Sequence, residues 1–506
     1  MAFELLTPTE MTEADRLTIA AGLIDGIGLM RRAGDAVATL ARERFPDAEG
    51  IAVLAGPGNN GGDGYVVAEQ LHRAGVAVTL WRAEAPRAGT DAAIAAAECG
   101  IEPRPLAEYA PQPGWVVVDA LFGAGLARPV DGVCAEALRK VESAGARVVA
   151  VDLPSGVSGA SGEVLGIAPQ ANLTVTFFRK KPGHVLYPGR TLCGEVAVAD
   201  IGIRHDVLEA IQPKTVENNP ANWIADFPSP AADTHKYSRG HVGVFSGGPS
   251  ATGAARLSAM AAARAGAGAV TLLAPGSALA VNAAHLTSII LRKSDSLEDA
   301  IEFLEARKPG ALVFGPGAGT TDKTGAFALE LISAASGGAG AIVFDADALT
   351  VFSRQRRDLL QKAHGAGAPA LVLTPHQGEF KRLFPELLDD KSLSKLDRAR
   401  LAAAQANAVL IYKGPDTVIA APDGRAAINA NGTPLLATAG SGDVLSGICA
   451  GLLAQGMPAF EAASAAVWMH AEAAQKFGPG LIAEDLPLAL RPVLSDLAGR
   501  PGGERP

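Results

Sequence analysis

Cysteine, aromatic side chains and clustered cations are all scarce in this sequence, and each shortage argues against a class of protein. The 506 residues include only 4 cysteines, and no two of them form a C-x-x-C pair, so neither a disulfide framework nor a zinc site is expected. The formal net charge is −9 and no basic run occurs, which argues against binding to nucleic acid. A protein of the reducing cytosol fits these absences.

Long apolar runs are missing as well. The first residues, MAFELLTPTEMTEADR, carry acids where a secretory leader has a basic start. The stretch 254–281 is apolar, but it consists largely of Ala and Gly and is interrupted by Arg256 and Arg264. We therefore expect a cytoplasmic protein that does not bind membranes.

What the sequence does contain is typical of a globular protein with more than one core. Hydrophobic residues make up 48% of the chain and charged residues 19%. Helical patterning from Thr12 to Arg44 opens the first half, and short apolar runs then alternate with helix-length gaps. These runs are IAVLA, VAVTL, WVVVDAL, RVVAVDL, LTVTFF and EVAVADIGI. The alternation predicts a Rossmann-like three-layer α/β/α domain, with a parallel sheet covered on both faces.

A proline-rich segment without a clear period, 205–236, separates this half from a second alternating half. The later runs are HVGVF, AVTLLAP, ALVFG, AIVFDADAL, ALVLTPH and AVLIYKG. We therefore predict two α/β domains, 1–212 and 221–506, that share no motif and are not an internal repeat.

Three polar, glycine-containing loops follow strands of the first half. The loop GPGNNGGDG contains a G-x-G-x-x-G match, but the next strand ends in Trp81-Arg82, where NAD binding would favour an acid. Asp119 and Asp152 each follow a later strand and could instead be turn formers or helix caps. Because ligands bind at the carboxyl ends of parallel strands, three such loops predict one shared site.

The second half contains TAGSGDVLSGICAG, in which small residues lead directly into a helix. Unpaired backbone N–H groups at such a helix start form an anion hole suited to a transferred phosphoryl group. Asp443 lies inside it, placed to accept a proton from an attacking hydroxyl. The alternative is a glycine-rich turn with Asp443 as a helix cap.

The motifs NNGGDG, DALFGAGL, DLPSG and KPGH resemble, in this order, the YjeF N-terminal domain, the NAD(P)H-hydrate epimerase family. The resemblance implies that Asp152 is the acid or base, and that potassium is held by Asn60, Asp119 and Ser155. It also implies a substrate-binding set: Asn59, Asn60, Gly61, Gly62, Asp63, Gly123, Ala124, Gly125, Leu126, Ala127, Arg128, Pro129 and Asp152.

The second half resembles the YjeF C-terminal domain, the ribokinase-like ADP/ATP-dependent NAD(P)H-hydrate dehydratases, through GSGD, GPGAG, FDADAL, TPHQGEF and YKGPDTV. Ser441 stands where that family often has Thr, which keeps a hydroxyl in place. The resemblance implies catalysis by Asp443. It also implies hydrate contacts at Ala254, Gly317, His376 and Asp443, and nucleotide contacts at Lys413, Gly414, Pro415, Asp416, Thr417 and Gly442.

Together the two resemblances imply a repair enzyme for hydrated NADH and NADPH. One domain would epimerise the R and S hydrates, and the other would dehydrate the S form with ADP or ATP, Mg²⁺ and, in the first domain, K⁺. A homo-oligomer is expected. The sequence does not determine whether ADP or ATP is used, whether NADH hydrate or NADPH hydrate is preferred, or whether substrate passes directly between the two sites.

Two alternatives remain open from the sequence. The second domain could be a small-molecule kinase of the same fold, and the first could be an inactive nucleotide-binding or interaction module. His470 is interpreted as packed beside Trp468 rather than catalytic, and Lys181 and His184 fit a turn equally well.

Overall fold

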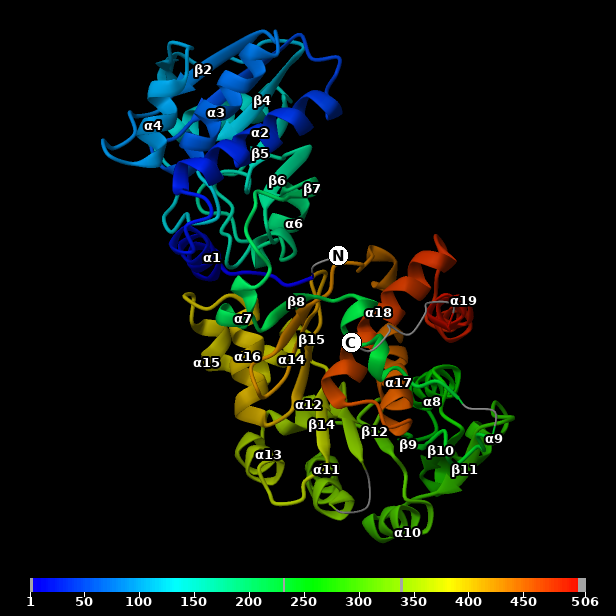
Figure 1. Ribbon diagram of the computed structural model, residues 1–506. Helices are drawn as coiled ribbons and strands as arrows, with labels where there is room; N and C mark the ends of the chain where they lie inside the picture. The colour runs from blue at the N-terminus through cyan, green and yellow to red at the C-terminus, as the bar shows by residue number, and fades with distance from the viewer. Residues whose placement is uncertain (1–2, 231–232, 337–339, 499–506) are drawn as a thin grey trace. The chain divides into compact units, whose positions relative to one another are not determined.

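The computed structural model describes residues 3–230, 233–336 and 340–498, and the chain divides into two compact units (Figure 1). The first unit is Met1–Val216 and the second is Glu217–Pro506, so the second begins ahead of the predicted start at 221. Within the described ranges, no helix has both the length and the apolar character needed to cross a bilayer.

The first unit is built on a seven-stranded sheet in which all neighbouring strands run parallel. The strand order is β3-β2-β1-β4-β5-β6-β7, so the chain steps outward from β1 in both directions, as in doubly wound folds. The strands are β1 (Gly50–Ala55), β2 (Val78–Arg82), β3 (Arg104–Pro105), β4 (Trp115–Ala120), β5 (Arg147–Val151), β6 (Leu173–Phe177) and β7 (Glu195–Ala199).

Helices cover both faces of this sheet. Val53 and Val118 belong to a core with α1, α2, α3 and α4, whereas Leu54 and Val117 belong to a second core with α5. The predicted three-layer α/β/α architecture is therefore confirmed. The helices are α1 (Pro8–Ala20), α2 (Gly26–Arg44), α3 (Asn59–Arg73), α4 (Asp91–Glu98), α5 (Gly132–Ser143), α6 (Gly189–Leu192) and α7 (Val207–Ile211).

The helical patterning expected from Thr12 to Arg44 forms two helices rather than one. The chain leaves α1 after Ala20, and α2 begins anew at Gly26. The break is caused by local capping, because the Asp25 side chain accepts a hydrogen bond from the Gly28 backbone N–H at 2.9 Å. A cap of this kind starts a new helix even where the apolar period continues.

The second unit is built on a ten-stranded sheet with the order β11-β10-β9-β12-β13-β14-β15-β16-β17-β8, of which the edge strand β8 spans the boundary at Val216. The strands from β11 to β15 are parallel, and the pairs β15–β16 and β16–β17 are antiparallel. The strands are β8 (Thr215–Glu217), β9 (His241–Phe245), β10 (Ala269–Ala274), β11 (Ile290–Lys293), β12 (Ala311–Phe314), β13 (Ala341–Phe344), β14 (Ala370–Leu373), β15 (Val409–Tyr412), β16 (Val418–Ala420) and β17 (Ala426–Ile428).

The helix that follows the GSGD motif, α17, is almost wholly buried and packs against α8 and against β12 and β13. The predicted α/β class of this half is confirmed. The helices are α8 (Gly253–Arg264), α9 (Leu279–Ala283), α10 (Leu297–Arg307), α11 (Asp322–Ala335), α12 (Asp347–Phe352), α13 (Arg356–Ala363), α14 (Gln377–Leu383), α15 (Pro385–Asp389), α16 (Lys395–Ala406), α17 (Ser441–Ala454), α18 (Ala459–Phe477) and α19 (Leu486–Ala498).

Part of the proline-rich segment expected to separate the domains belongs to the core of the second unit. The Asn218 amide donates to Asn429 Oδ1 at 3.0 Å and to the Ser464 carbonyl at 2.8 Å, and the Trp223 indole N–H donates to Asn218 Oδ1 at 3.2 Å. All three amide and indole groups are buried. A buried network of this kind fixes the start of the unit before residue 221.

Candidate functional site

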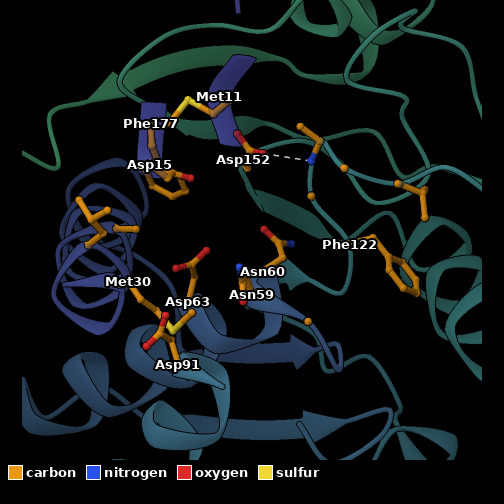
Figure 2. Close-up of a pocket in the computed structure, with 18 of the residues that line it drawn as sticks. Met11, Asp15, Met30, Asn59, Asn60, Asp63, Asp91, Phe122, Asp152 and Phe177 are labelled. Atoms are coloured by element: carbon orange, nitrogen blue, oxygen red, sulfur yellow. Dashed lines mark hydrogen bonds between the residues drawn. The ribbon is translucent and has the colours of Figure 1, made fainter. Parts of the chain in front are cut away.

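A cavity of about 690 Å³ lies at the carboxyl ends of β1, β4 and β5 in the first unit (Figure 2). Its lining comes from the loops after these strands, from the first turn of α3, and from α1 and α2. Met11, Met30 and Phe177 give it an apolar wall, while Asp63 and Asp152 point into it. This is the position at which open parallel sheets bind ligands.

Most of the substrate-binding residues predicted in the first half line this cavity. They are Asn59, Asn60, Asp63, Gly123, Ala124, Gly125, Leu126, Ala127, Arg128 and Asp152. Gly61, Gly62 and Pro129 are not part of the lining. A Cβ at Gly61 would lie 1.8 Å from the Gly56 carbonyl oxygen, so glycine there lets α3 begin against the end of β1.

Asp152 is the residue directly after β5, and three donors hold its carboxylate. Lys181 Nζ donates to Oδ1 at 2.6 Å, the Thr176 hydroxyl donates to Oδ1 at 2.8 Å, and the Ala124 backbone N–H donates to Oδ2 at 3.0 Å. The backbone of Asp152 has a φ of +66°, a conformation that costs energy for a residue with a side chain. Strain of this kind at a cavity wall is typical of a functional position.

Lys181 and His184 both belong to this site, although the KPGH motif fits a plain turn equally well. The Lys181 ammonium is buried against Asp152, and the His184 Nε2–H donates to the Asp152 carbonyl at 2.7 Å. His184 Nδ1 accepts the Lys181 backbone N–H at 2.9 Å, which fixes the neutral tautomer. Burial and the nearby Lys181 charge lower the pKa of His184 to about 4.

The carboxyl groups of the cavity have pKa values shifted in opposite directions. Burial alone would raise the pKa of Asp152, but the charge and hydrogen bond of Lys181 overcome this and lower it to about 2. Burial and the charges of Asp152 and Asp15 raise the pKa of Asp63 well above its usual value. Burial likewise raises the pKa of Asp15 to about 6, although Lys181 opposes the shift. The cavity thus holds one carboxylate that Lys181 keeps ionised and two carboxyl groups whose ionisation is disfavoured.

Beneath the cavity lies an oxygen-rich cluster made by the predicted potassium ligands. The Ser155 hydroxyl and backbone N–H donate to Asp119 at 2.6 and 2.8 Å, and the same hydroxyl oxygen accepts the Phe122 backbone N–H at 2.8 Å. Asn60 lines the cavity above, and its buried Nδ2 has no hydrogen-bond partner among the described residues. Buried oxygen donors around one carboxylate fit a hard cation such as potassium.

The site of the second unit is built around the first turn of α17. Gly440 precedes this helix with a φ of +88°, so the small residue allows the sharp entry. Asp443 lies in the first turn, and its carboxylate makes no hydrogen bond with any residue in the described part of the chain. Burial and the charges of Asp345 and Asp347 raise the pKa of Asp443 to about 7, against the opposing charge of Lys413.

The partly buried Lys413 forms an ion pair with the buried Asp345 beside this turn. Lys413 Nζ lies 3.0 Å from Asp345 Oδ1, and the Ser446 hydroxyl of α17 donates to Asp345 Oδ2 at 2.6 Å. A Cβ placed on Gly442 would lie 3.4 Å from Lys413 Nζ, so the ammonium adjoins the N-terminus of α17. A cation and a helix N-terminus together stabilise a phosphoryl group.

The predicted nucleotide-binding loop, residues 413–417, is held from below by α16. Lys395 is partly buried, forms an ion pair with the Asp416 carboxylate and donates to the Asp416 carbonyl at 3.1 Å. The Thr417 hydroxyl donates to the Gly414 carbonyl at 2.8 Å. The side chains of Asp416 and Thr417 therefore shape the loop, while Gly414 and Pro415 are exposed on its surface.

Of the predicted hydrate contacts of the second unit, Ala254 lies near the same helix start. Ser258 of α8 donates to the carbonyls of Asp443 and Ala254 at 2.8 and 3.2 Å, which places Ala254 near Asp443. His376 begins α14, and its Nδ1 accepts the Gly378 backbone N–H at 2.9 Å. Gly317 follows β12 with a φ of +70°.

His470 does more than pack beside Trp468. Its Nε2 lies 3.2 Å from the Ser441 hydroxyl at the start of α17, so the ring supports the glycine-rich loop from within the core. Burial lowers the pKa of His470 to about 4, which keeps it neutral. The supporting roles of His470, Lys181 and Asp345 depend on contacts between distant segments. In the sequence, only Lys181 and Asp345 lie in recognised motifs, KPGH and FDADAL.

Known proteins resemble the chain along nearly its whole length. Residues 26–183 match the family model of the YjeF-related protein N-terminus, and residues 242–488 match that of NAD(P)H-hydrate dehydratase. A bifunctional NAD(P)H-hydrate repair enzyme of Moorella thermoacetica is 35% identical, with 96% of each chain covered. One from Thermofilum pendens is also 35% identical, covering 87% of this chain and 86% of its own.

Among solved structures, an ADP/ATP-dependent NAD(P)H-hydrate dehydratase from Bacillus subtilis, co-crystallised with ATP/Mg²⁺, is 25% identical. It covers 56% of this chain and 98% of its own, with a TM-score of 0.47.

Proposed function

The chain belongs to the family of bifunctional NAD(P)H-hydrate repair enzymes, and from this premise we propose how its two units share the repair. The first unit is an epimerase for the R and S hydrates of NADH and NADPH. The second unit is a dehydratase that consumes ADP or ATP and returns the S hydrate to NADH or NADPH. The cavity above β1, β4 and β5, with Asp152 at its wall, supports the first assignment.

The chemistry of the substrate explains why two different sites are needed. A hydrated nicotinamide ring carries a hydroxyl on C6, beside the ring nitrogen N1, and an added hydrogen on C5. The nitrogen lone pair can expel a leaving group from C6, but hydroxide leaves poorly. One site can protonate the departing oxygen and let it return to the other face. The other can convert the hydroxyl into a phosphate ester.

In the second unit, Asp443 supports the phosphoryl step. Its unpaired carboxylate takes the proton of the C6 hydroxyl as the oxygen attacks the terminal phosphorus of the nucleotide. Lys413 and the N-terminus of α17 stabilise the charge on the transferred group. The nitrogen lone pair then expels phosphate, and loss of the C5 proton restores the double bond.

Two inorganic ions are part of the proposal. The side-chain oxygens of Asn60, Asp119 and Ser155 would hold potassium, which would supply positive charge near the hydrate. Mg²⁺ would accompany the phosphates of the nucleotide, where it neutralises charge. Residues 413–417 and Gly442 would contact the nucleotide, and Ala254, Gly317 and His376 the hydrate. A homo-oligomer and a cytoplasmic location stay predictions.

Recovery of NADH absorbance from a prepared mixture of R and S hydrates tests the whole proposal. With ADP or ATP, the full chain should recover the reduced ring from both epimers. Without nucleotide it should only interconvert them, as chromatography would show. Accumulation of a stable phosphorylated product would instead identify the second unit as a small-molecule kinase. Failure to interconvert the epimers would mark the first unit as a binding module.

A further inference from the structure

Exchange of the C6 configuration needs proton transfer on both faces of the ring, if the first unit is the epimerase proposed above. On one face the C6–O bond breaks as an acid protonates the departing oxygen, and the N1 lone pair forms an N1=C6 double bond. On the other face water attacks C6 and gives a proton to a base. In the reverse direction the two groups exchange roles, so each face needs a group that both donates and accepts.

Asp152 and Lys181 account for one face. Their ion pair, with an N–O distance of 2.6 Å, forms one wall of the cavity after β5 and β6. The Ala124 N–H and the Thr176 hydroxyl donate to the same carboxylate and hold its orientation. If the nicotinamide ring lies flat against this ion pair, neither Asp152 nor Lys181 can reach the opposite face of the ring.

A second acidic wall is formed by α1 and α3. Met11, Asp15 and Ile19 recur every four residues on one face of α1, and all three line the cavity. In the first turn of α3, Asn59 and Asp63 share a face in the same way. Figure 2 shows Asp63 and Asp152 entering the open space from opposite sides, with Asp15 beside Phe177.

The carboxyl groups of this second wall are available for chemistry. In the described part of the chain, neither Asp15 nor Asp63 has a hydrogen-bonding or ion-pair partner, unlike Asp152. Both are partly exposed, and the exposure is toward the cavity that they line. Phe177 and Met30 add apolar surface to the same lining.

We propose that Asp63, with Asp15 as its charge partner, donates and accepts the proton at the C6 oxygen on the ring face opposite Asp152. Hydroxide leaving that face takes the Asp63 proton and departs as water. Water attacking that face in the reverse direction returns a proton to the Asp63 carboxylate. Asp15 carries a like charge nearby and so disfavours the ionised form of Asp63.

The main test compares Asp63→Asn and Asp15→Asn with Glu13→Gln, which changes an exposed acid on the outer face of α1. Loss of a positioned acid–base group commonly lowers a rate about 10²- to 10⁴-fold, so kcat for epimerisation by Asp63→Asn should fall by that range with KM nearly unchanged. A rise in KM at unchanged kcat would show that Asp63 only binds the hydrate, which overturns the proposal. Calorimetry of each variant beside the wild type reports whether the first unit is folded, because dehydration of pure S hydrate depends on the second unit alone.

The pH profile separates Asp15 from a merely structural residue. Asp63, Asp91, Arg128, Asp152 and Lys181 are the other charged groups of the cavity lining. Removing the Asp15 charge makes Asp63 easier to ionise, so the alkaline limb of the epimerisation profile should move to lower pH in Asp15→Asn. The profile of Glu13→Gln should coincide with that of the wild type. An unshifted limb in Asp15→Asn would remove Asp15 from the proposal.

Oxygen exchange in the wild-type protein provides a test that needs no variant. In water enriched in ¹⁸O, breaking of the C6–O bond places solvent oxygen in the hydrate as it epimerises. Epimerisation with complete retention of the original oxygen would show that the ring opens at N1–C6 instead, and would overturn the proposal. A wild-type chain that does not epimerise at all would contradict the proposed function itself.

Discussion

Each unit places a Lys–Asp ion pair at the carboxyl end of its parallel strands, but the two pairs involve different kinds of aspartate. In the first unit, Lys181 holds Asp152, the residue predicted to be the acid or base. In the second unit, Lys413 pairs with Asp345, and the predicted base, Asp443, has no partner among residues 3–230, 233–336 and 340–498. The comparison shows that a carboxylate paired with lysine stays ionised, whereas an unpaired carboxyl group can still bind and release a proton.

The backbone is strained close to both pairs. Asp152 directly follows β5 and has a φ of +66°, whereas Asp345 directly follows β13 and the next residue, Ala346, has a φ of +49°. The Asp345 carboxylate also accepts the Ala346 backbone N–H at 2.8 Å. Strained positions persist only where surrounding contacts compensate for them, and here the lysine pairs supply those contacts.

Removal of the two predicted catalytic carboxylates should give the largest effect and separate the units. Asp443→Asn keeps the shape of the helix start but removes the proton acceptor, so dehydration should fall about 10²- to 10⁴-fold while epimerisation continues. Asp152→Asn should do the reverse, because Lys181 loses its anion. Assays of pure and mixed epimers, with chromatographic separation of R and S, would measure both.

If either variant lowered both epimerisation and dehydration, the two units would not carry separate activities and the comparison would fail. A wild-type rate of dehydration in Asp443→Asn, or of epimerisation in Asp152→Asn, would show that the corresponding role is wrong.

A smaller effect is expected from Asp345→Asn, which removes the partner of Lys413 but keeps the hydrogen bond to Ser446. Loss of one preorganised donor costs about 10²- to 10³-fold, and a displaced Lys413 should cost less than that. The Asp345 charge also raises the pKa of Asp443. The acidic limb of the dehydration profile should therefore move to lower pH in Asp345→Asn.

The matched control is Asp347→Asn, since Asp347 raises the same pKa but forms no ion pair with Lys413. It should shift the limb in the same direction and leave the KM for nucleotide unchanged. If Asp345→Asn shifts nothing, Asp345 does not act on Asp443.

Exchange of potassium should affect one unit alone. Replacing it with a bulky organic cation should slow epimerisation about tenfold, which corresponds to ~1.4 kcal/mol of lost charge stabilisation. Dehydration of the pure S hydrate should hold its rate, because the oxygen cluster of Asn60, Asp119 and Ser155 belongs to the first unit. Unchanged epimerisation rates would remove the cation from the account.

The smallest effect on activity is expected when the two units are separated into fragments. Fragments 1–212 and 221–506 should each be soluble and retain one activity. The second fragment lacks Asn218, so Asn429 and the Trp223 indole lose buried partners, at a cost of about 1–3 kcal/mol for each unsatisfied group. A fragment starting at 214 should therefore melt at a higher temperature in calorimetry. Equal melting temperatures would show that the Asn218 network contributes nothing.

Regular elements could be read from the sequence where a local pattern is long enough. The buried strands β1, β4, β5 and β13 coincide with apolar runs, and the helices after NNGGDG and GSGD begin where the glycines end. The strands β16 and β17 have three residues each, too few to show a period, and they form only because β15 offers an edge to pair with.

The residues of the candidate site also fall into two groups, those that a local motif predicts and those that it does not. Asp152 and Asp443 were found because each sits inside a motif at a strand or helix end. Asp15 was missed because an acid in an amphipathic helix is usually a solvated residue, and only the tertiary fold turns that face of α1 toward Lys181. The role of Lys181 was missed for a similar reason, since its partner lies on another strand.

The central claim is that the proton transferred in each reaction moves to or from the carboxyl group that is not paired with lysine. The pH profiles of epimerisation and dehydration test this claim directly. Both activities would be measured on the same wild-type sample across a pH series. Dehydration should be lost as pH falls through the Asp443 pKa of about 7, because the base becomes protonated. Epimerisation should be lost as pH rises through the raised pKa of Asp63, because the acid loses its proton. Profiles that rise and fall together, or an epimerisation rate that stays flat into alkaline solution, would contradict the account.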